Sequence, residues 1–139
     1  MNTTTAANNA TSSGMGIAKA PLISIVDDDE SVREALKSLI DSVGFRAEVF
    51  ASGEEFLNSS HVSQTDCLIA DVRMSGMSGL ELQDRLKAAN SPVPIVFISA
   101  HDDGEARARG LRGGAIAFLK KPFSEESLLG AISDSLDKS

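Results

Sequence analysis

The sequence predicts an α/β fold in which a five-stranded parallel sheet is covered by five helices. Short apolar runs alternate with stretches of helical periodicity from Pro21 almost to the C-terminus, which indicates repeated βα units. The runs are apolar at nearly every position, as is typical of strands buried on both faces of a parallel sheet. We therefore expect right-handed crossovers that place helices on both faces.

The first two strand and helix pairs occupy residues 22–60. "LISIV" is the first strand, and the helix "SVREALKSLIDSVG" repeats its apolar residues every three or four positions: Val32, Ala35, Leu36, Leu39, Ile40 and Val43. Gly44 suits the position just past the end of this helix. "FRAEVF" alternates apolar and polar residues as a second strand, and a short helix follows near "GEEFLNSS".

Three further strands are predicted at "CLIADV", "PIVFISA" and "AIAFLK". The helices between and after them are "SGLELQDRLKAAN", "DDGEARARGLRGG" and "SEESLLGAISDSLDK". The fourth helix has the weakest signal, because its glycines lower helix propensity and it has few large apolar residues. This segment is therefore a candidate for mobility.

Composition favours one domain over residues 21–139, preceded by a flexible tail over residues 1–20, which is rich in small polar residues. No apolar run approaches the roughly 18 residues of a membrane helix, and the N-terminus does not resemble a signal peptide. Cys67 is the lone cysteine and stands in an apolar run, so we expect its thiol to be buried and inert. It has no partner for an internal disulfide, which favours a reducing cytoplasm as the location of the protein. The net charge of −7 argues against DNA binding by this chain, and we expect no membrane association.

Polar residues stand at the carboxyl ends of four of the predicted strands: Asp27 and Asp28, Asp71, Ser99, and Lys120 with Lys121. Ligands bind beyond the carboxyl ends of the strands in an open parallel sheet, so these side chains are expected to converge. Asp66 begins the third strand instead, which places it roughly 15 Å away at the opposite edge. It is therefore excluded from the site.

Crowded carboxylates remain ionised together most easily when a divalent cation lies among them. Magnesium fits best, since it accepts one or two carboxylates, keeps several waters and bridges to phosphate oxygens. Asp28 and Asp71 are the direct candidates, with Asp27 acting through a water. Lys121 and Ser99 add a cation and a hydroxyl donor for phosphoryl oxygens. The reaction class that this set suggests is phosphoryl transfer onto Asp71, giving an acyl phosphate.

Four blocks, "IVDDDESVREAL", "IADVRMSGMSGLEL", "PIVFISAH" and "AFLKKPF", resemble those of the bacterial response-regulator receiver domain, and of its FixJ-like branch in particular. The resemblance covers Pro21 to about Leu136, and the order and spacing of the blocks make it specific. It implies a flavodoxin-like, doubly wound sheet with strand order 2-1-3-4-5. It also implies a two-component phosphorelay protein that is phosphorylated by a sensor histidine kinase in the presence of Mg²⁺.

The resemblance assigns roles position by position. Asp27 and Asp28 match the acidic pair, Asp71 the phosphorylated aspartate, Ser99 the switch hydroxyl, Phe118 the aromatic that changes rotamer, and Lys121 the invariant lysine. Arg73 matches the position whose backbone carbonyl completes the metal shell. The FixJ-like pattern further implies homodimerisation on phosphorylation, through the fourth helix, fifth strand and fifth helix.

Simpler interpretations accompany these assignments. The acidic run also suits a helix N-cap, and Asp29 and Glu30 are expected to be only that. Asp71 alone would be an ordinary turn residue. Phe118 is as well explained by core packing, and Lys120 by an exposed surface charge.

Two departures from the family pattern stand out. Ser75 follows Met74 where the family commonly has proline, so the loop after Asp71 is expected to be less rigid. FixJ-like relatives usually carry a C-terminal helix-turn-helix module, and this sequence stops at Ser139 without one. The chain is therefore a stand-alone receiver or a fragment.

A signalling receiver would promote only its own phosphorylation and dephosphorylation, so we do not expect an enzyme. Two other functions compete with this interpretation. A Mg²⁺-dependent phosphatase or phosphotransferase could use the same aspartate nucleophile. It would need a general acid two residues later, where Arg73 stands, and usually a capping domain. The other alternative is a constitutive interaction domain whose acidic site no longer turns over.

Overall fold

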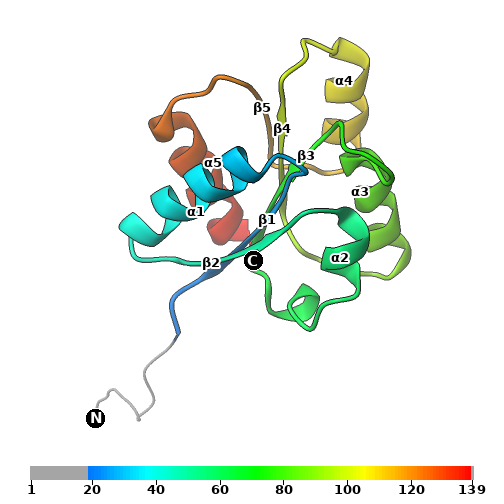
Figure 1. Cartoon of the computed structure of the whole chain (residues 1–139). Coiled ribbons are helices and arrows are strands. Elements are labelled where there is room, and N and C mark those ends of the chain that lie inside the picture. Colours follow the sequence, from blue (N-terminus) through cyan, green and yellow to red (C-terminus); the bar gives the residue numbers. More distant parts are fainter. Residues whose placement is uncertain (1–18, 139) are drawn as a thin grey trace.

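The computed structural model describes residues 19–138 and consists of five strands alternating with five α-helices (Figure 1). The strands are β1 Leu22–Val26, β2 Arg46–Phe50, β3 Cys67–Asp71, β4 Ile95–Ser99 and β5 Ala117–Lys120. The helices are α1 Glu30–Ser42, α2 Gly53–Leu57, α3 Gly79–Ala88, α4 Gly104–Arg112 and α5 Glu125–Lys138. A short 3₁₀ helix, η1 Val62–Gln64, was not predicted. Residues 1–18 of the expected tail lie outside the described part.

The strands form one parallel sheet in the order β2-β1-β3-β4-β5, which confirms the flavodoxin-like prediction. The chain first adds β2 on one side of β1 and then β3 on the other. The winding direction therefore reverses between β1 and β3, and ligands of such sheets bind beyond the carboxyl ends of the strands at this point.

Helices α1 and α5 cover one face of the sheet, and α2, α3 and α4 cover the other (Figure 1). Alternate strand residues enter the two cores, as Phe97 packs toward α3 and α4 while Val96 and Ile98 pack toward α1 and α5. Because both faces are covered, β1, β3 and β4 are buried at every position. This explains the near-continuous apolar runs in the sequence.

One glycine of α4, Gly110, has a packing reason that the sequence did not reveal. A Cβ at Gly110 would lie 2.9 Å from the Phe97 ring, so only glycine lets α4 approach β4 this closely. The Gln83 amide of α3 donates to the Gly110 carbonyl over 3.0 Å. Helix α4 is thus held by tertiary packing despite its low intrinsic propensity.

Two local predictions for α1 hold in the structure. Asp29 is the N-cap, and its side chain accepts hydrogen bonds from the backbone N–H groups of Ser31 and Val32. Gly44 follows the C-cap with a φ of 89°, a conformation that glycine adopts without strain.

Within residues 19–138, no helix combines the length and apolar character needed to cross a membrane.

The thiol of Cys67 is free and fully buried in β3. Burial raises the pKa of this thiol to about 11, so it stays protonated and unreactive at neutral pH. The lone cysteine is therefore part of the core.

Candidate functional site

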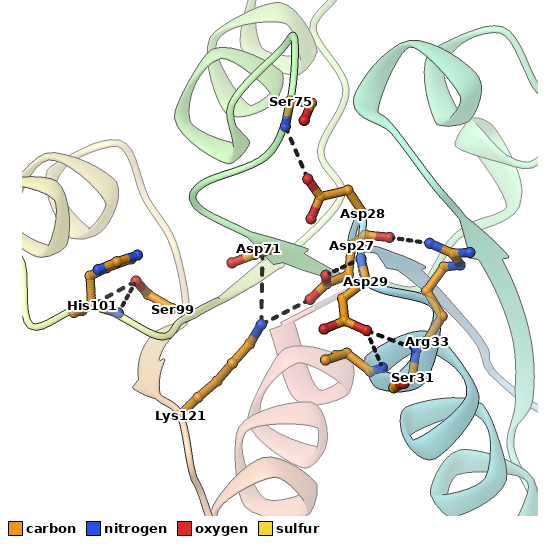
Figure 2. A network of polar contacts seen from close by, with 11 residues as sticks. Asp27, Asp28, Asp29, Ser31, Arg33, Asp71, Ser75, Ser99, His101 and Lys121 are labelled. Carbon is orange, nitrogen blue, oxygen red and sulfur yellow. Dashed lines mark hydrogen bonds and ion pairs between the residues drawn. The ribbon is translucent and has the colours of Figure 1, made fainter.

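Three aspartates converge at the carboxyl ends of β1 and β3 (Figure 2). β1 pairs with β3 in parallel, with Val26 opposite Ala70, so the residues that follow them in the chain emerge side by side. One carboxylate oxygen each from Asp27, Asp28 and Asp71 lies within 4.8 Å of the other two. The convergence results directly from the strand register.

Asp27 is completely buried, and each of its carboxylate oxygens accepts one hydrogen bond. Oδ1 accepts the backbone N–H of Asp29 over 2.9 Å, and Oδ2 accepts Lys121 Nζ over 3.1 Å. Arg33 Nη1 also donates to the Asp27 backbone carbonyl over 2.8 Å. These three bonds hold Asp27 in place, and its contact with a cation through a water stays a prediction.

Lys121 follows the edge strand β5 and bridges two of the aspartates. Its Nζ lies 3.1 Å from Asp27 Oδ2 and 3.8 Å from Asp71 Oδ2. Its backbone N–H donates a hydrogen bond to the backbone carbonyl of Ser99 over 2.7 Å, and the peptide bond to Pro122 is cis. Lys120 instead points to solvent, 4.0 Å from the exposed Asp102, as expected of a surface charge.

The position of Asp71 raises the pKa of its carboxyl from 3.8 to about 6. Burial is the largest cause, followed by repulsion from the Asp27 carboxylate. The Lys121 ammonium and a backbone hydrogen bond from Arg73 act in the opposite direction. A pKa this far from the usual value is typical of functional sites, and here it sits among converging charges.

The backbone of Gly79 packs closely against the backbone of Asp71. A Cβ on Gly79, the first residue of α3, would collide with the Asp71 carbonyl. The Gly79 N–H donates a hydrogen bond to the Val72 carbonyl over 2.9 Å, so the start of α3 is connected directly to the end of β3. Packing therefore requires the second glycine of "MSGMSG".

The side chain of Asp28 is exposed, unlike those of Asp27 and Asp71. Its Oδ2 accepts the backbone N–H of Ser75 over 3.1 Å, which connects the loop after β1 to the loop after β3 (Figure 2). The cluster therefore has a buried side formed by Asp27 and Asp71 and an open side at Asp28.

These donors fit a hard divalent cation. They are carboxylate oxygens, the three together need a counter-charge beyond Lys121, and the open side at Asp28 leaves room for the waters that Mg²⁺ retains. Within residues 19–138, no histidine or cysteine joins the group, so a softer metal has no matching ligand there.

Comparisons with known proteins agree with this geometry. Residues 23–133 match the family model of the response regulator receiver domain. The chain belongs to this family.

Among curated relatives, this receiver is 48% identical to the response regulator protein TodT of Pseudomonas putida, over 82% of the chain and 50% of the relative. It is 36% identical to the transcriptional regulatory protein FixJ of Bradyrhizobium diazoefficiens, over 82% of the chain and 56% of the relative. The structure of the response regulator StyR matches with a TM-score of 0.80 and 47% identity, covering 85% of this chain and 60% of that one. The FixJ-like resemblance is thus confirmed, and the chain spans about half the length of these curated relatives.

Neither Ser99 nor Phe118 forms a described hydrogen bond or ion pair with the receiver's acidic cluster. The Ser99 hydroxyl is bonded within its own loop, to the carbonyl and N–H of His101 over 3.2 and 3.1 Å. The Phe118 ring is only 7% exposed and packs against Phe97. Arg107 lies over this ring at 6.0 Å and donates to the Phe118 carbonyl. An inward turn of Phe118 would therefore start from a ring that is already buried, and the rotamer change stays a prediction.

Sequence reasoning missed three contacts around the site. The first is the hydrogen bond from the Arg33 side chain to the Asp27 backbone carbonyl. The second is the hydrogen bond from the Ser75 N–H to the Asp28 carboxylate, and the third is the ion pair of Arg73 with Asp103 over 2.7 Å. Serine in place of the family's usual proline permits the second contact, because only a residue other than proline has an N–H to donate there. All three contacts depend on loop paths that no motif specifies.

Proposed function

We propose that this receiver accepts a phosphoryl group from a sensor histidine kinase onto Asp71 in a Mg²⁺-dependent reaction. The resulting change of conformation controls a partner or output. The observation that carries this proposal is the juxtaposition of Asp71 with Asp27, Asp28 and Lys121 at the winding reversal of the sheet. A cytoplasmic location follows from the same assignment.

In the proposed reaction, a carboxylate oxygen of Asp71 forms a bond to phosphorus as the phosphorus–nitrogen bond of a phosphohistidine breaks. The imidazole nitrogen keeps the electron pair of that bond. Asp28 and Asp71 would hold Mg²⁺ directly, with Asp27 through a water and the Arg73 carbonyl completing the shell. When bound, the ion neutralises charge on the transferring oxygens.

Lys121 has two partners before transfer and gains a third after it. Its ammonium lies between Asp27 and Asp71, within reach of a group bonded to Asp71. A phosphoryl oxygen there would form a charge-assisted contact with Nζ. Lys121 would therefore stabilise the developing charge and remain paired with the product.

A protein phosphodonor also needs a surface beside Asp71, and a groove lies next to Lys121. It has a volume of about 380 Å³ and separates α1 from the segment after β5. Its lining is mainly apolar and includes Val32, Leu36, Leu39 and Phe123. Within this proposal, we expect the kinase to contact this groove, because it is apolar and adjoins Lys121.

The phosphatase alternative is weakened by Arg73. A proton donor is required two residues after the nucleophile, but the Arg73 guanidinium stays charged and is paired with Asp103 over 2.7 Å. No observation in residues 19–138 favours small-molecule turnover.

The test is the intact mass of the protein after incubation with acetyl phosphate and Mg²⁺. We expect one added phosphoryl mass that hydroxylamine removes, as an acyl phosphate requires. Asp71→Asn should abolish the gain, whereas Asp66→Asn, just before the other end of β3, should keep it. If Asp71→Asn gained the mass at the wild-type rate, the assignment would be wrong.

A further inference from the structure

The backbone N–H of Ser75 holds the carboxylate of Asp28 over 3.1 Å (Figure 2). Ser75 lies four residues beyond Asp71 in the exposed loop before α3, and Asp28 lies in the loop after β1. Within residues 19–138, this is the one hydrogen bond to the Asp28 side chain. The contact therefore decides where an otherwise free carboxylate points.

Receivers commonly carry proline at the position of Ser75. Proline has no backbone N–H, so it cannot donate to Asp28. The link is thus a consequence of the residue that this chain has in place of the family's usual one. The same replacement that was expected only to loosen the loop provides a donor.

We propose that the Ser75 N–H is a positioning group that orients Asp28 for the metal. An exposed aspartate samples several rotamers, and binding an ion through it requires one of them. A fixed donor selects the rotamer in advance, as hydrogen bonds to metal-ligating carboxylates do generally. This inference rests on the metal site of the proposed function and adds a determinant of its affinity.

The N–H and the ion share the carboxylate and do not compete for it. A carboxylate has two oxygens with about four acceptor positions, and Ser75 occupies one position on Oδ2. The donor also places partial positive charge beside a cluster in which Asp27 and Asp71 repel Asp28. It therefore keeps Asp28 near the other two carboxylates while no cation is present.

The decisive comparison is Ser75→Pro with Ser75→Ala. Both remove the hydroxyl, but only the proline removes the N–H. We expect Ser75→Pro to weaken Mg²⁺ binding about tenfold, at the lower end of the effects of outer hydrogen-bond partners, and Ser75→Ala to bind like the wild type. Affinity is measured by following backbone amide resonances during Mg²⁺ titration. Unchanged or tighter binding by Ser75→Pro, or equal weakening by both variants, would overturn the proposal.

Two further measurements locate the effect. In an Asp28→Ala background, Ser75→Pro should cause no additional loss, because its acceptor is already gone. The Ser75 amide should exchange its hydrogen more slowly in the wild type than in Asp28→Ala. This readout does not depend on how the proline variant folds, and equal exchange in the two proteins would contradict the contact.

The proposed function and this inference fail in different ways. If the wild type does not bind Mg²⁺, both fall together. If the wild type binds Mg²⁺ and Ser75→Pro binds it equally, the metal site stands and only the role of Ser75 is lost.

Discussion

The ionised carboxylate of Asp71 lowers the stability of the folded protein, because it is largely buried and close to Asp27. Its folded pKa of about 6 lies above the ordinary value of 3.8, so folding favours the protonated form. As pH rises from 4 toward 6, the folded state holds the proton longer than the unfolded chain, and stability falls over that range. Above pH 6 the full cost of an ionised Asp71 is present until a cation offsets it.

Replacing this carboxylate should therefore stabilise the metal-free protein. We expect Asp71→Asn to raise the free energy of unfolding at pH 7.5 by roughly 1 to 3 kcal/mol, and to have little effect at pH 4. Urea unfolding followed by far-UV circular dichroism in EDTA measures both values. Saturating Mg²⁺ should remove the advantage by stabilising the wild type. An equal gain at both pH values would show that repulsion at Asp71 is not the cause.

Asp28 should show a related but smaller effect, because its side chain is exposed. Asp28→Ala is expected to weaken Mg²⁺ binding while relieving repulsion in the apo-protein. Titration of this variant with Mg²⁺ tests the first part, and urea unfolding in EDTA tests the second. An unchanged affinity would remove Asp28 from the direct ligands.

At this scale the sequence predicted which side chains meet but not which backbone groups hold them. The sequence places Asp27, Asp28, Asp71 and Lys121 together because each stands at the carboxyl end of a strand of one parallel sheet. The Ser75 N–H depends on the path of an irregular loop, and no side-chain pattern encodes that path.

Among the elements, α4 is tied to the loop after Asp71 by a single carboxylate. Asp103 caps α4 by accepting the Ala106 N–H over 3.0 Å, and its other oxygen binds Arg73 over 2.7 Å. The Ser99 hydroxyl, four residues before this cap, has its described hydrogen bonds only to His101 in its own loop. The β4–α4 loop can therefore respond to a new group on Asp71.

A phosphoryl oxygen would offer Ser99 a charge-assisted hydrogen bond worth about 1.5 to 3 kcal/mol, enough to draw its hydroxyl from His101. We expect beryllofluoride, a phosphoryl mimic, to change hydrogen exchange across residues 99–120. Ser99→Ala should reduce the change. Unaltered protection across this segment, with Ser99→Ala behaving like the wild type, would contradict the switch.

The elements themselves were largely predictable, because apolar runs and helical periodicity identify strands and helices buried in layers. The interpretation of α4 was incomplete for a physical reason. Its glycines lower propensity, but Gly110 also permits close packing on Phe97, a contact 13 residues away along the chain that only the folded sheet creates. The 3₁₀ helix η1 was missed because a single turn has no periodicity to detect.

At the scale of the whole molecule, two large apolar side chains stand out among the described residues as exposed. Leu111, on α4, is 38% exposed, and Val43, at the C-terminal end of α1, is 42% exposed. They lie on helices that cover opposite faces of the sheet (Figure 1). Only Leu111 belongs to the face formed by α4, β5 and α5, where the FixJ-like pattern implies homodimerisation.

These two residues make a matched test of the dimer. We expect beryllofluoride with Mg²⁺ to shift the wild type toward a dimer in sedimentation velocity. Leu111→Glu should weaken that dimer, because burying a leucine contributes up to about 1.5 to 3 kcal/mol and a two-fold interface contains the residue twice. Val43→Glu adds the same charge on the other side of the molecule and should dimerise like the wild type. A dimer that tolerates Leu111→Glu but is lost in Val43→Glu would place the interface on the α1 face and contradict the prediction.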